Sequence, residues 1–305
     1  MMRYFEKQVS KEEDGAMVKE VIRTLGAGRQ LRRRMLEQQL IQVNGKPAFL
    51  TERVREGDFV TMDAPADEPS ILTPENLPFN VAYEDDHLLI ADKPADMLVH
   101  PTAKERTGTL ANAVLYYMLS KKEQYPFRPL HRLDRDTSGL LVIAKHKLTL
   151  ERLEKALKRR EIKREYVAFT QGRIGQKQLT IDAPIGLLPN QTIKRGIVPD
   201  GRSARTHLKV LQWFPEDRAT KVHVSLETGR THQIRVHLAH LGHPVLGDGL
   251  YGRGSEYGLQ RQALHAANLT FEHPFTHSII RVSSALPEDL AMLEKELSLS
   301  LNEKE

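Results

Sequence analysis

The chain has 305 residues, of which 40% are hydrophobic and 28% are charged, a composition typical of a soluble globular protein with room for about two domains. It contains no cysteine, which excludes a disulfide scaffold and thiolate metal sites and suits a reducing compartment. No apolar run approaches the roughly 18 residues of a membrane span, and the charged opening from Met1 to Gly15 is unlike a signal peptide, so we expect a cytoplasmic protein.

Positive charge is concentrated near the N-terminus. The net charge is +5, and the segment from Val21 to Val60 alone holds eight basic and four acidic side chains. A basic patch on one small module, beside a nearly balanced remainder, is typical of a protein that contacts a polyanion such as RNA.

Residues 1–62 are predicted to form a small αβ module of a helix, a short helix and compact hairpins. The Asn44-Gly45 pair predicts a tight hairpin turn. The VNGK and EGDFV stretches resemble the alpha-L RNA-binding domain over residues 14–62. That resemblance implies RNA contacts by the basic residues of the module, Arg29, Arg32, Arg33 and Lys46, of which the three arginines share one helical face. The alternative interpretation is a basic helix that is only exposed to solvent.

Residues 63–78 separate this module from the rest of the chain. They contain four prolines and little apolar periodicity, which predicts an extended linker. We expect the parts on either side to be mobile relative to one another, with residues 79–305 forming a second and larger domain.

The densest polar motif lies between His131 and Asp136, where two carboxylates, two guanidiniums and one imidazole fall within six residues. The apolar run Leu140–Ala144 follows and predicts a buried strand, which would hold this loop at a sheet edge, where substrates are commonly met. One alternative is a solvated network of ion pairs. Another is the D-T-S-G turn of an aspartic protease over residues 136–139, whose chemistry needs a second such turn that this sequence lacks.

The nine-residue run HRLDRDTSG at residues 131–139 resembles the signature of the RluA-type pseudouridine synthases, which isomerise uridine in RNA. Two further stretches match the family in order, REYVA at residues 164–168 and LETGRTHQIRVH at residues 226–237. The resemblance covers residues 80–290, and an ordered set of motifs is far more specific than one member.

The resemblance implies a role for several residues. Asp134 is the reactive carboxylate, which attacks the sugar, adds to the base or removes a ribose proton. Tyr166 stacks on the uracil and assists proton removal at C5, and Arg235 pairs with Asp134. The substrate-binding residues are His131, Arg132, which lies near the space vacated by the flipped nucleotide, and Ile234, which supplies an apolar wall.

The reaction has no net redox change and calls for no metal, nucleotide cofactor or thiol, so we expect none. The partner is RNA, with large-subunit ribosomal RNA favoured over transfer RNA, and neither a membrane nor an obligate protein partner is indicated. The runner-up from another class is a non-catalytic RNA-binding assembly factor. Strands separated by turns as often as by helices predict an α+β fold, with a mixed, mainly antiparallel sheet and a central cleft.

Several local predictions concern the larger domain. Residues 147–160 are predicted to be an amphipathic helix, and Thr231 is the predicted N-cap of a helix that ends at Gly242. Asp96 stands where the family has glycine, which could permit a positive φ that aspartate accepts only with strain, so the conformation of this turn stays open. The glycine-rich run at 247–252 is predicted to be a loop rather than a nucleotide-binding turn, and the histidines at 237, 240 and 243 lack zinc-helix spacing.

Overall fold

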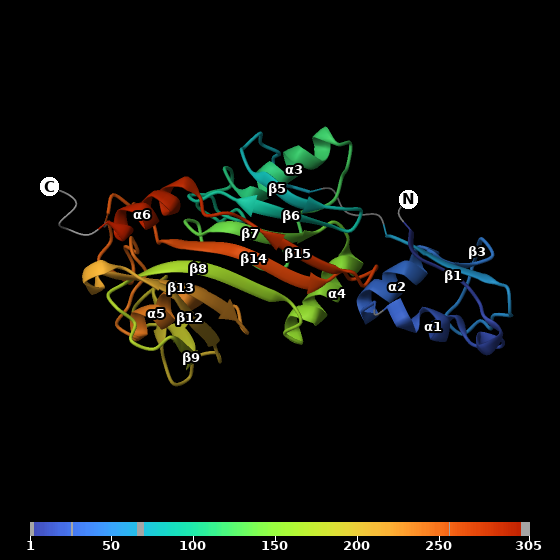
Figure 1. The fold of residues 1–305 in the computed structure, drawn as a ribbon. Coiled ribbons are helices and arrows are strands. Elements are labelled where there is room, and N and C mark those ends of the chain that lie inside the picture. The colour runs from blue at the N-terminus through green and yellow to red at the C-terminus, as the bar shows by residue number, and fades with distance from the viewer. Residues whose placement is uncertain (1–2, 26, 66–69, 256, 300–305) are drawn as a thin grey trace.

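The computed structural model describes residues 3–25, 27–65, 70–255 and 257–299. Within these residues the strands form a four-stranded sheet near the N-terminus, a nine-stranded sheet in the larger part and a separate two-stranded hairpin. Helices pack around both larger sheets (Figure 1). The predicted α+β class, with a mixed and mainly antiparallel sheet beside a small N-terminal αβ part, is confirmed.

The N-terminal sheet has the order β1-β4-β2-β3. The predicted Asn44-Gly45 hairpin is confirmed, because both residues adopt positive φ, at 49° and 76°. The prediction that the module opens with a helix is wrong. Its first element is β1, a strand whose alternating charges and single buried side chain, Tyr4, hide it among polar residues. The elements are β1 (Arg3–Gln8), α1 (Val18–Val21), α2 (Arg29–Glu37), β2 (Ile41–Val43), β3 (Lys46–Pro47) and β4 (Phe59–Asp63), with 3₁₀ turns at Lys11–Glu13 and Ile22–Leu25.

The nine-stranded sheet has the order β5-β6-β7-β14-β8-β13-β12-β9, with β15 paired to β14. Its described pairings are antiparallel except that of β7 with β14, where His265 lies opposite Ser138. Its strands are β5 (Asn80–Glu84), β6 (Leu88–Lys93), β7 (Ser138–Ala144), β8 (Lys163–Gln171), β9 (Gln178–Asp182), β12 (Arg205–Trp213), β13 (Ala219–Leu226), β14 (Leu264–Glu272) and β15 (Ile279–Ser283). The separate hairpin is β10 (Ile185–Leu187) with β11 (Arg195–Ile197).

Helices cover both faces of this sheet. Along β6 and β7, Leu89 and Leu141 join the core under α3 (Leu110–Ser120), whereas the neighbours Leu88 and Leu140 join the core under α4 (Lys147–Lys158). Buried strands with apolar side chains on both faces read as continuous hydrophobic runs, as the sequence of β7 does. Figure 1 shows α3 and α4 on opposite sides of these strands.

Two further helices are α5 (Gln233–His240) and α6 (Glu288–Ser298). The prediction that Thr231 caps α5 is wrong, since the N-cap is His232 in a left-handed conformation. The Gln233 side chain replaces the predicted cap, because its Oε1 accepts hydrogen bonds from the Arg230 amide and the Thr228 hydroxyl at 3.0 and 2.8 Å. None of the helices in the described residues is long and apolar enough to cross a lipid bilayer.

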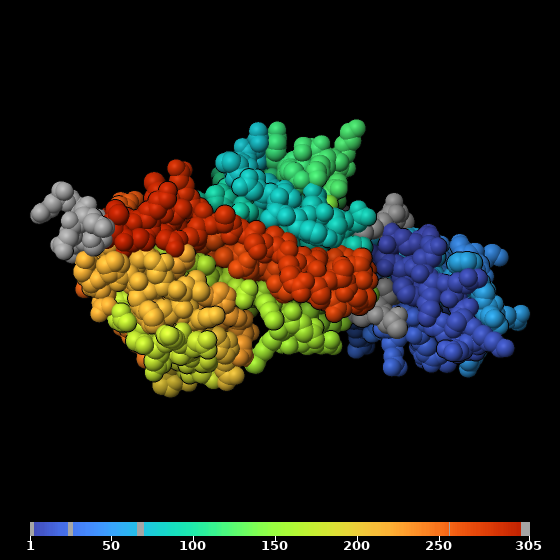
Figure 2. All heavy atoms as spheres, in the orientation of Figure 1, coloured from blue at the N-terminus to red at the C-terminus, as the bar shows by residue number. Residues whose placement is uncertain are grey.

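The N-terminal part lies directly against α4, at the end of the larger part where the β14–β15 hairpin also ends (Figure 2). Leu148 of α4 is completely buried among the apolar side chains of the N-terminal core, and Phe275 packs at the edge of that core. The Glu151 carboxylate accepts a hydrogen bond of 2.6 Å from the Gly28 amide, at the start of α2. Acidic groups are stabilising at helix N-termini, so α4 both packs on the module and caps one of its helices.

The proline-rich segment is without regular secondary structure where it is described, at residues 64–65 and 70–79. Its second half is held along α3, because the Asn112 amide donates a 2.7 Å hydrogen bond to the Thr73 carbonyl. The Glu75 carboxylate also accepts a 2.6 Å bond from the Gly108 amide. These contacts fix the path by which the chain enters the large sheet.

Candidate active site

A cavity of about 500 Å³ opens where the loop before β7, the strand β8 and the start of α5 meet. Six of its lining side chains are basic, Arg132, Lys158, Arg160, Arg164, Arg230 and Arg235, against two acidic ones, Asp134 and Glu227. A concave surface with this excess of cations attracts a polyanion such as an RNA backbone.

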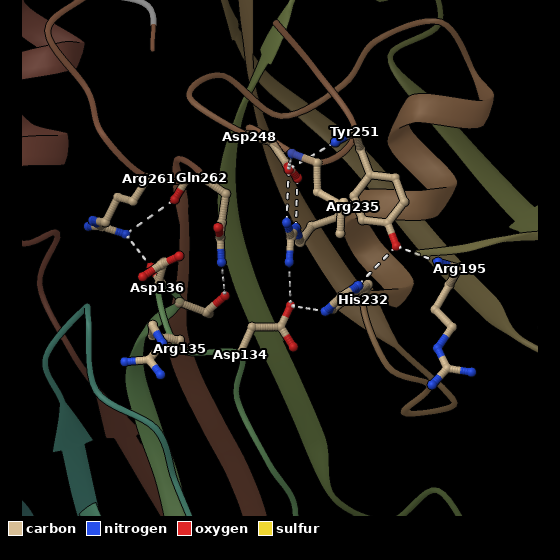
Figure 3. A network of polar contacts seen from close by, with 12 residues as sticks. Asp134, Arg135, Asp136, Arg195, His232, Arg235, Asp248, Tyr251, Arg261 and Gln262 are labelled. Atoms are coloured by element: carbon tan, nitrogen blue, oxygen red, sulfur yellow. Dashed lines mark hydrogen bonds and ion pairs between the residues drawn. The ribbon is translucent and has the colours of Figure 1, made fainter. Parts of the chain in front are cut away.

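The loop over residues 131–137 is held by groups from distant parts of the chain. The buried Lys93 ammonium donates to the carbonyls of Pro94, Met97 and Arg135, at 2.7 to 2.8 Å. Arg261 donates to the Asp136 carbonyl at 2.9 Å (Figure 3). Lys93 thus ties the loop, at Arg135, to the segment that holds Pro94 and Met97, and Arg261 adds a second tie at Asp136. The loop therefore presents its side chains from a fixed support.

Gly139 is the second residue of β7, just after this loop. Its φ is +110°, and a Cβ atom built there would lie 2.3 Å from the Ala266 carbonyl oxygen of β14. Only glycine tolerates both conditions. The glycine therefore allows the close parallel contact of β7 and β14 that places the loop beside the cavity.

Asp134 and Arg235 form the ion pair that the sequence predicted. The Arg235 Nη1 atom lies 3.1 Å from Asp134 Oδ2. The same guanidinium donates two further hydrogen bonds to Asp248, from Nε to Oδ2 at 2.6 Å and from Nη2 to Oδ1 at 2.8 Å (Figure 3). Arg235 thus bridges two carboxylates, one at the cavity wall and one fully buried behind it.

These contacts set the charge of the cluster. Burial alone raises the pKa of Asp248, but the two hydrogen bonds and the charge of Arg235 outweigh it and hold the pKa below its usual range. Burial opposes the charge on Arg235, yet Asp248 and then Asp134 raise its pKa above the ordinary value. The guanidinium is therefore a permanent cation aimed at Asp134.

Asp248 was missed in the sequence because it lies in the glycine-rich run at 247–252, which is a loop as predicted. Its carboxylate also accepts hydrogen bonds from the Leu250 and Tyr251 amides. The loop is tightly packed, because a Cβ atom added at Gly247, the residue before Asp248, would lie 2.1 Å from the Arg261 carbonyl oxygen. Glycine beside an acidic residue therefore points to burial, but nothing in the sequence spacing connects this loop with Arg235.

His232 and Tyr251 form a second arm of the network. His232 Nε2 lies 3.9 Å from Asp134 Oδ2, and its Nδ1 is hydrogen-bonded to the Tyr251 hydroxyl at 2.9 Å. The Tyr251 ring also lies under the Arg235 guanidinium, 5.1 Å from ring centroid to Cζ, within the range of a cation–π contact. Neither residue was singled out as functional in the sequence.

Tyr166 and Ile234 line the cavity from β8 and α5, where both were predicted to contribute to the site. Both side chains are almost fully buried. Burial raises the pKa of Tyr166, with Asp134 adding to the effect, so its phenol is neutral. Together they give the cavity an apolar wall against which a flat ring can stack.

The remaining loop residues occupy different depths. Arg132 is exposed at the cavity rim, whereas both ring nitrogens of His131 are buried. Burial, with a smaller contribution from Arg164, lowers the pKa of His131 to about 3. His131 is therefore a neutral lining group, and Arg132 is an exposed cation at the mouth of the cavity.

The four basic residues predicted to contact RNA through the N-terminal module lie outside this cavity. Arg29, Arg33 and Lys46 are exposed and Arg32 is half-buried. Arg33 forms an exposed pair with Glu37, from Nε to Oε1 at 2.8 Å. Arg29 begins α2, where a cation is unfavourable for the helix dipole, so its charge does not serve the stability of that helix.

The histidines near the end of α5 have other partners. The buried His237 ring is hydrogen-bonded to the Thr206 hydroxyl at 2.8 Å and the Ala183 carbonyl at 3.0 Å, and the His243 ring contacts the Gln171 carbonyl. Across the described ranges, no group of three or more histidine or acidic side chains has an arrangement suited to a metal ion.

Comparison with known proteins is consistent with this geometry. Residues 87–240 match the model of the family described as RNA pseudouridylate synthase. The chain is 39% identical over 292 residues to an uncharacterized RNA pseudouridine synthase, YhcT, of Bacillus subtilis (strain 168), covering 95% of this chain and 96% of the relative. It is 40% identical over 267 residues to the ribosomal large subunit pseudouridine synthase D of Nitrosomonas europaea, covering 85% and 77%.

A solved structure has the same fold. The human RNA pseudouridylate synthase domain containing 1 aligns with a TM-score of 0.56 and 26% identity, over 76% of this chain and 98% of its own. The structure of the human RNA pseudouridylate synthase domain containing 4 aligns with a TM-score of 0.58 and 20% identity, over 72% of this chain and 94% of its own. The alignment therefore extends over most of the described chain.

Proposed function

Since the chain belongs to the RNA pseudouridylate synthase family and is an RNA pseudouridine synthase, we propose that Asp134 is its reactive carboxylate and that its substrate is large-subunit ribosomal RNA. The observation that carries the site is the Asp134 carboxylate, held at the wall of a basic cavity by a buried arginine. The similarity to a relative named as a ribosomal large subunit synthase supports the choice of RNA.

The reaction breaks the bond between ribose C1′ and uracil N1, turns the uracil and joins C1′ to C5. The proton on C5 is lost to solvent and N1 gains one, so the product is an isomer of the substrate. A carboxylate acts on the ribose or the base, and the detached uracil must be retained during its turn. Asp134 supplies the carboxylate, while Tyr166 and Ile234 hold the ring by stacking and apolar contact.

The target uridine must leave its stack to reach Asp134, which is partly buried. Flipping a base costs a few kcal/mol, which contacts to the surrounding backbone repay. Arg132 at the rim is placed to occupy or stabilise the vacated position, and His131 lines the deeper wall. These roles follow the family resemblance and are compatible with the depth of each side chain.

The target is tested by mapping pseudouridines in total RNA from cells with and without this gene. We expect a small number of sites in large-subunit ribosomal RNA to lose the modification when the gene is deleted. Losses confined to transfer RNA would reassign the substrate, and an unchanged map would favour the non-catalytic assembly factor.

A salt-dependence measurement tests the N-terminal arginines. Changing both Arg29 and Arg33 to glutamine should weaken binding to a ribosomal RNA fragment. It should also reduce the slope of log affinity against log salt concentration by about 1 to 2, because fewer counterions are released from the RNA when fewer phosphates are contacted. The matched control changes to glutamine the exposed Lys177, which precedes the edge strand β9, and the exposed Lys209 of its neighbour β12. Equal effects in both double variants would refute a dedicated RNA contact by α2.

A further inference from the structure

The two oxygens of the Asp134 carboxylate are in different surroundings. Oδ2 accepts the hydrogen bond from Arg235 Nη1 at 3.1 Å and also faces His232 Nε2 at 3.9 Å. Among the described residues, no hydrogen bond of the chain reaches Oδ1. Asp134 lines the cavity and keeps 18% of its side chain exposed. One oxygen is therefore engaged by the protein and the other is free for the substrate.

The protonation pattern of His232 follows from its partner. The Arg195 amide donates to the Tyr251 hydroxyl oxygen at 2.9 Å. Because this oxygen already accepts one hydrogen bond, we assign the hydroxyl as the donor in its other contact, to His232 Nδ1 at 2.9 Å. Nδ1 is then the acceptor, and a neutral imidazole carries its proton on Nε2. Figure 3 shows this path from Arg195 through Tyr251 and His232 to Asp134.

His232 is also held in a costly backbone conformation. Its φ of 58° and ψ of 20° are left-handed, which costs an L-residue other than glycine about 1 to 3 kcal/mol. Asparagine, aspartate and histidine adopt this conformation more often than other residues that carry a side chain. The backbone therefore accommodates His232 without requiring it, and the case for a role rests on the contacts of its ring.

We propose that His232 is a positioning residue for Asp134. Tyr251 fixes the tautomer of the His232 ring, so that its Nε2–H group and Arg235 together direct the Oδ2 atom of Asp134. The Oδ1 atom is then left as the oxygen that acts on the nucleotide. This inference rests on the proposed role of Asp134. It assigns distinct tasks to the two carboxylate oxygens and brings His232 and Tyr251 into the site.

The proposal has a consequence for pH. Burial is the main cause of the lowered pKa of His232. The charge of Asp134, and more weakly that of Asp248, raises this pKa, whereas Arg235, and more weakly Arg132, lowers it further. The Tyr251 hydroxyl also favours the neutral ring by donating to Nδ1. Protonation would place a second cation beside Oδ2 and weaken the carboxylate as a base or nucleophile, so turnover should fall as His232 becomes charged.

Two substitutions at position 232 separate the ring from the backbone. Turnover is measured as release of tritium from uridine C5, using unmodified transcripts of the source organism's large-subunit ribosomal RNA and transfer RNAs. His232→Asn should keep or raise thermal stability, yet lower the single-turnover rate by about 10- to 100-fold through misplacement of the carboxylate. His232→Gln, whose amide reaches the position of Nε2, should recover part of this loss.

The matched control is His240→Gln, which makes the same change at an exposed position at the end of the same helix, and its rate should equal that of wild type. A wild-type rate in His232→Asn would overturn the proposal. So would equal losses in the asparagine and glutamine variants, because they would show that the position of the donor does not matter.

The tautomer is tested without turnover. The His232 ring is titrated by NMR in protein labelled at histidine, with the signal identified by its loss in His232→Gln. We expect a midpoint below the ordinary value of about 6.5, and a rise in that midpoint in Tyr251→Phe. The acid side of the pH–rate profile should move to higher pH in the same variant. An unchanged midpoint would overturn the role of Tyr251, whereas absence of tritium release from wild type would instead refute the proposed function.

Discussion

Asp134→Asn should abolish pseudouridine formation, lowering the single-turnover rate by about 10⁴-fold or more, as expected when a nucleophile or base is removed. The amide has the shape of the carboxylate, and its oxygen can still accept the hydrogen bond from Arg235. The variant should therefore fold and bind RNA normally, since the loop is held through backbone carbonyls and not through this side chain. Tritium release and RNA affinity are the two measurements.

The matched control is Asp136→Asn, two residues away on the same loop. Burial, with Asp96 adding, raises the pKa of Asp136, and its carbonyl contact with Arg261 does not depend on the side chain. This variant should change the stability of the loop more than the chemistry. Full activity in Asp134→Asn, shown by mass spectrometry to be free of deamidation, would contradict the assignment of the reactive carboxylate.

Arg235→Met should cause the second-largest effect, because the guanidinium serves two carboxylates. Removing it leaves Asp248 buried with no cation, and breaking a buried pair in this way costs about 3 to 5 kcal/mol. The loss should appear in chemical denaturation. In the fraction that remains folded, turnover should fall, since Asp134 loses the hydrogen bond and the charge that hold its Oδ2 atom.

Arg235→Lys should be intermediate in activity. An ammonium keeps the charge, but it cannot place parallel hydrogen bonds on Asp248 while reaching Asp134. The control Arg173→Met removes an arginine from an exposed pair with Asp217 and should cost less than about 1 kcal/mol. A wild-type single-turnover rate for Arg235→Met at neutral pH would show that the pair is structural.

Much of the site is predictable because its chemistry is local in sequence. The loop from His131 to Asp136 and the strand after it form one continuous motif. The pairing of Asp134 with Arg235, 101 residues away, is present as well, and it was implied by the family resemblance. Asp96, which replaces the family's glycine, adopts a positive φ of 54°, so the turn keeps the conformation that glycine would permit. Contiguous motifs and backbone rules were therefore the strongest signals.

The missed residues depend on contacts between distant segments. Asp248 and Tyr251 reach the site from a loop that sequence spacing does not connect to Arg235, and Lys93 acts from the end of β6 through carbonyl groups that have no sequence signature. The wrong cap at Thr231 has a related cause. The side chain of Gln233, the first residue of α5, satisfies the turn instead, and N-cap preferences, which favour serine, threonine, aspartate and asparagine, do not signal such a role for glutamine.

The position of α4 makes the N-terminal module less separable than the proline-rich segment before β5 suggests. The first turn of this helix contributes Leu148 to the apolar core of the module, while Leu153, further along, belongs to the core of the large sheet. A truncated chain that starts after residue 62 would carry a bare leucine on α4 and a Glu151 carboxylate with no helix to cap. Exchange of the module between related enzymes should therefore succeed only with a compatible α4, so the module and that helix form one structural unit.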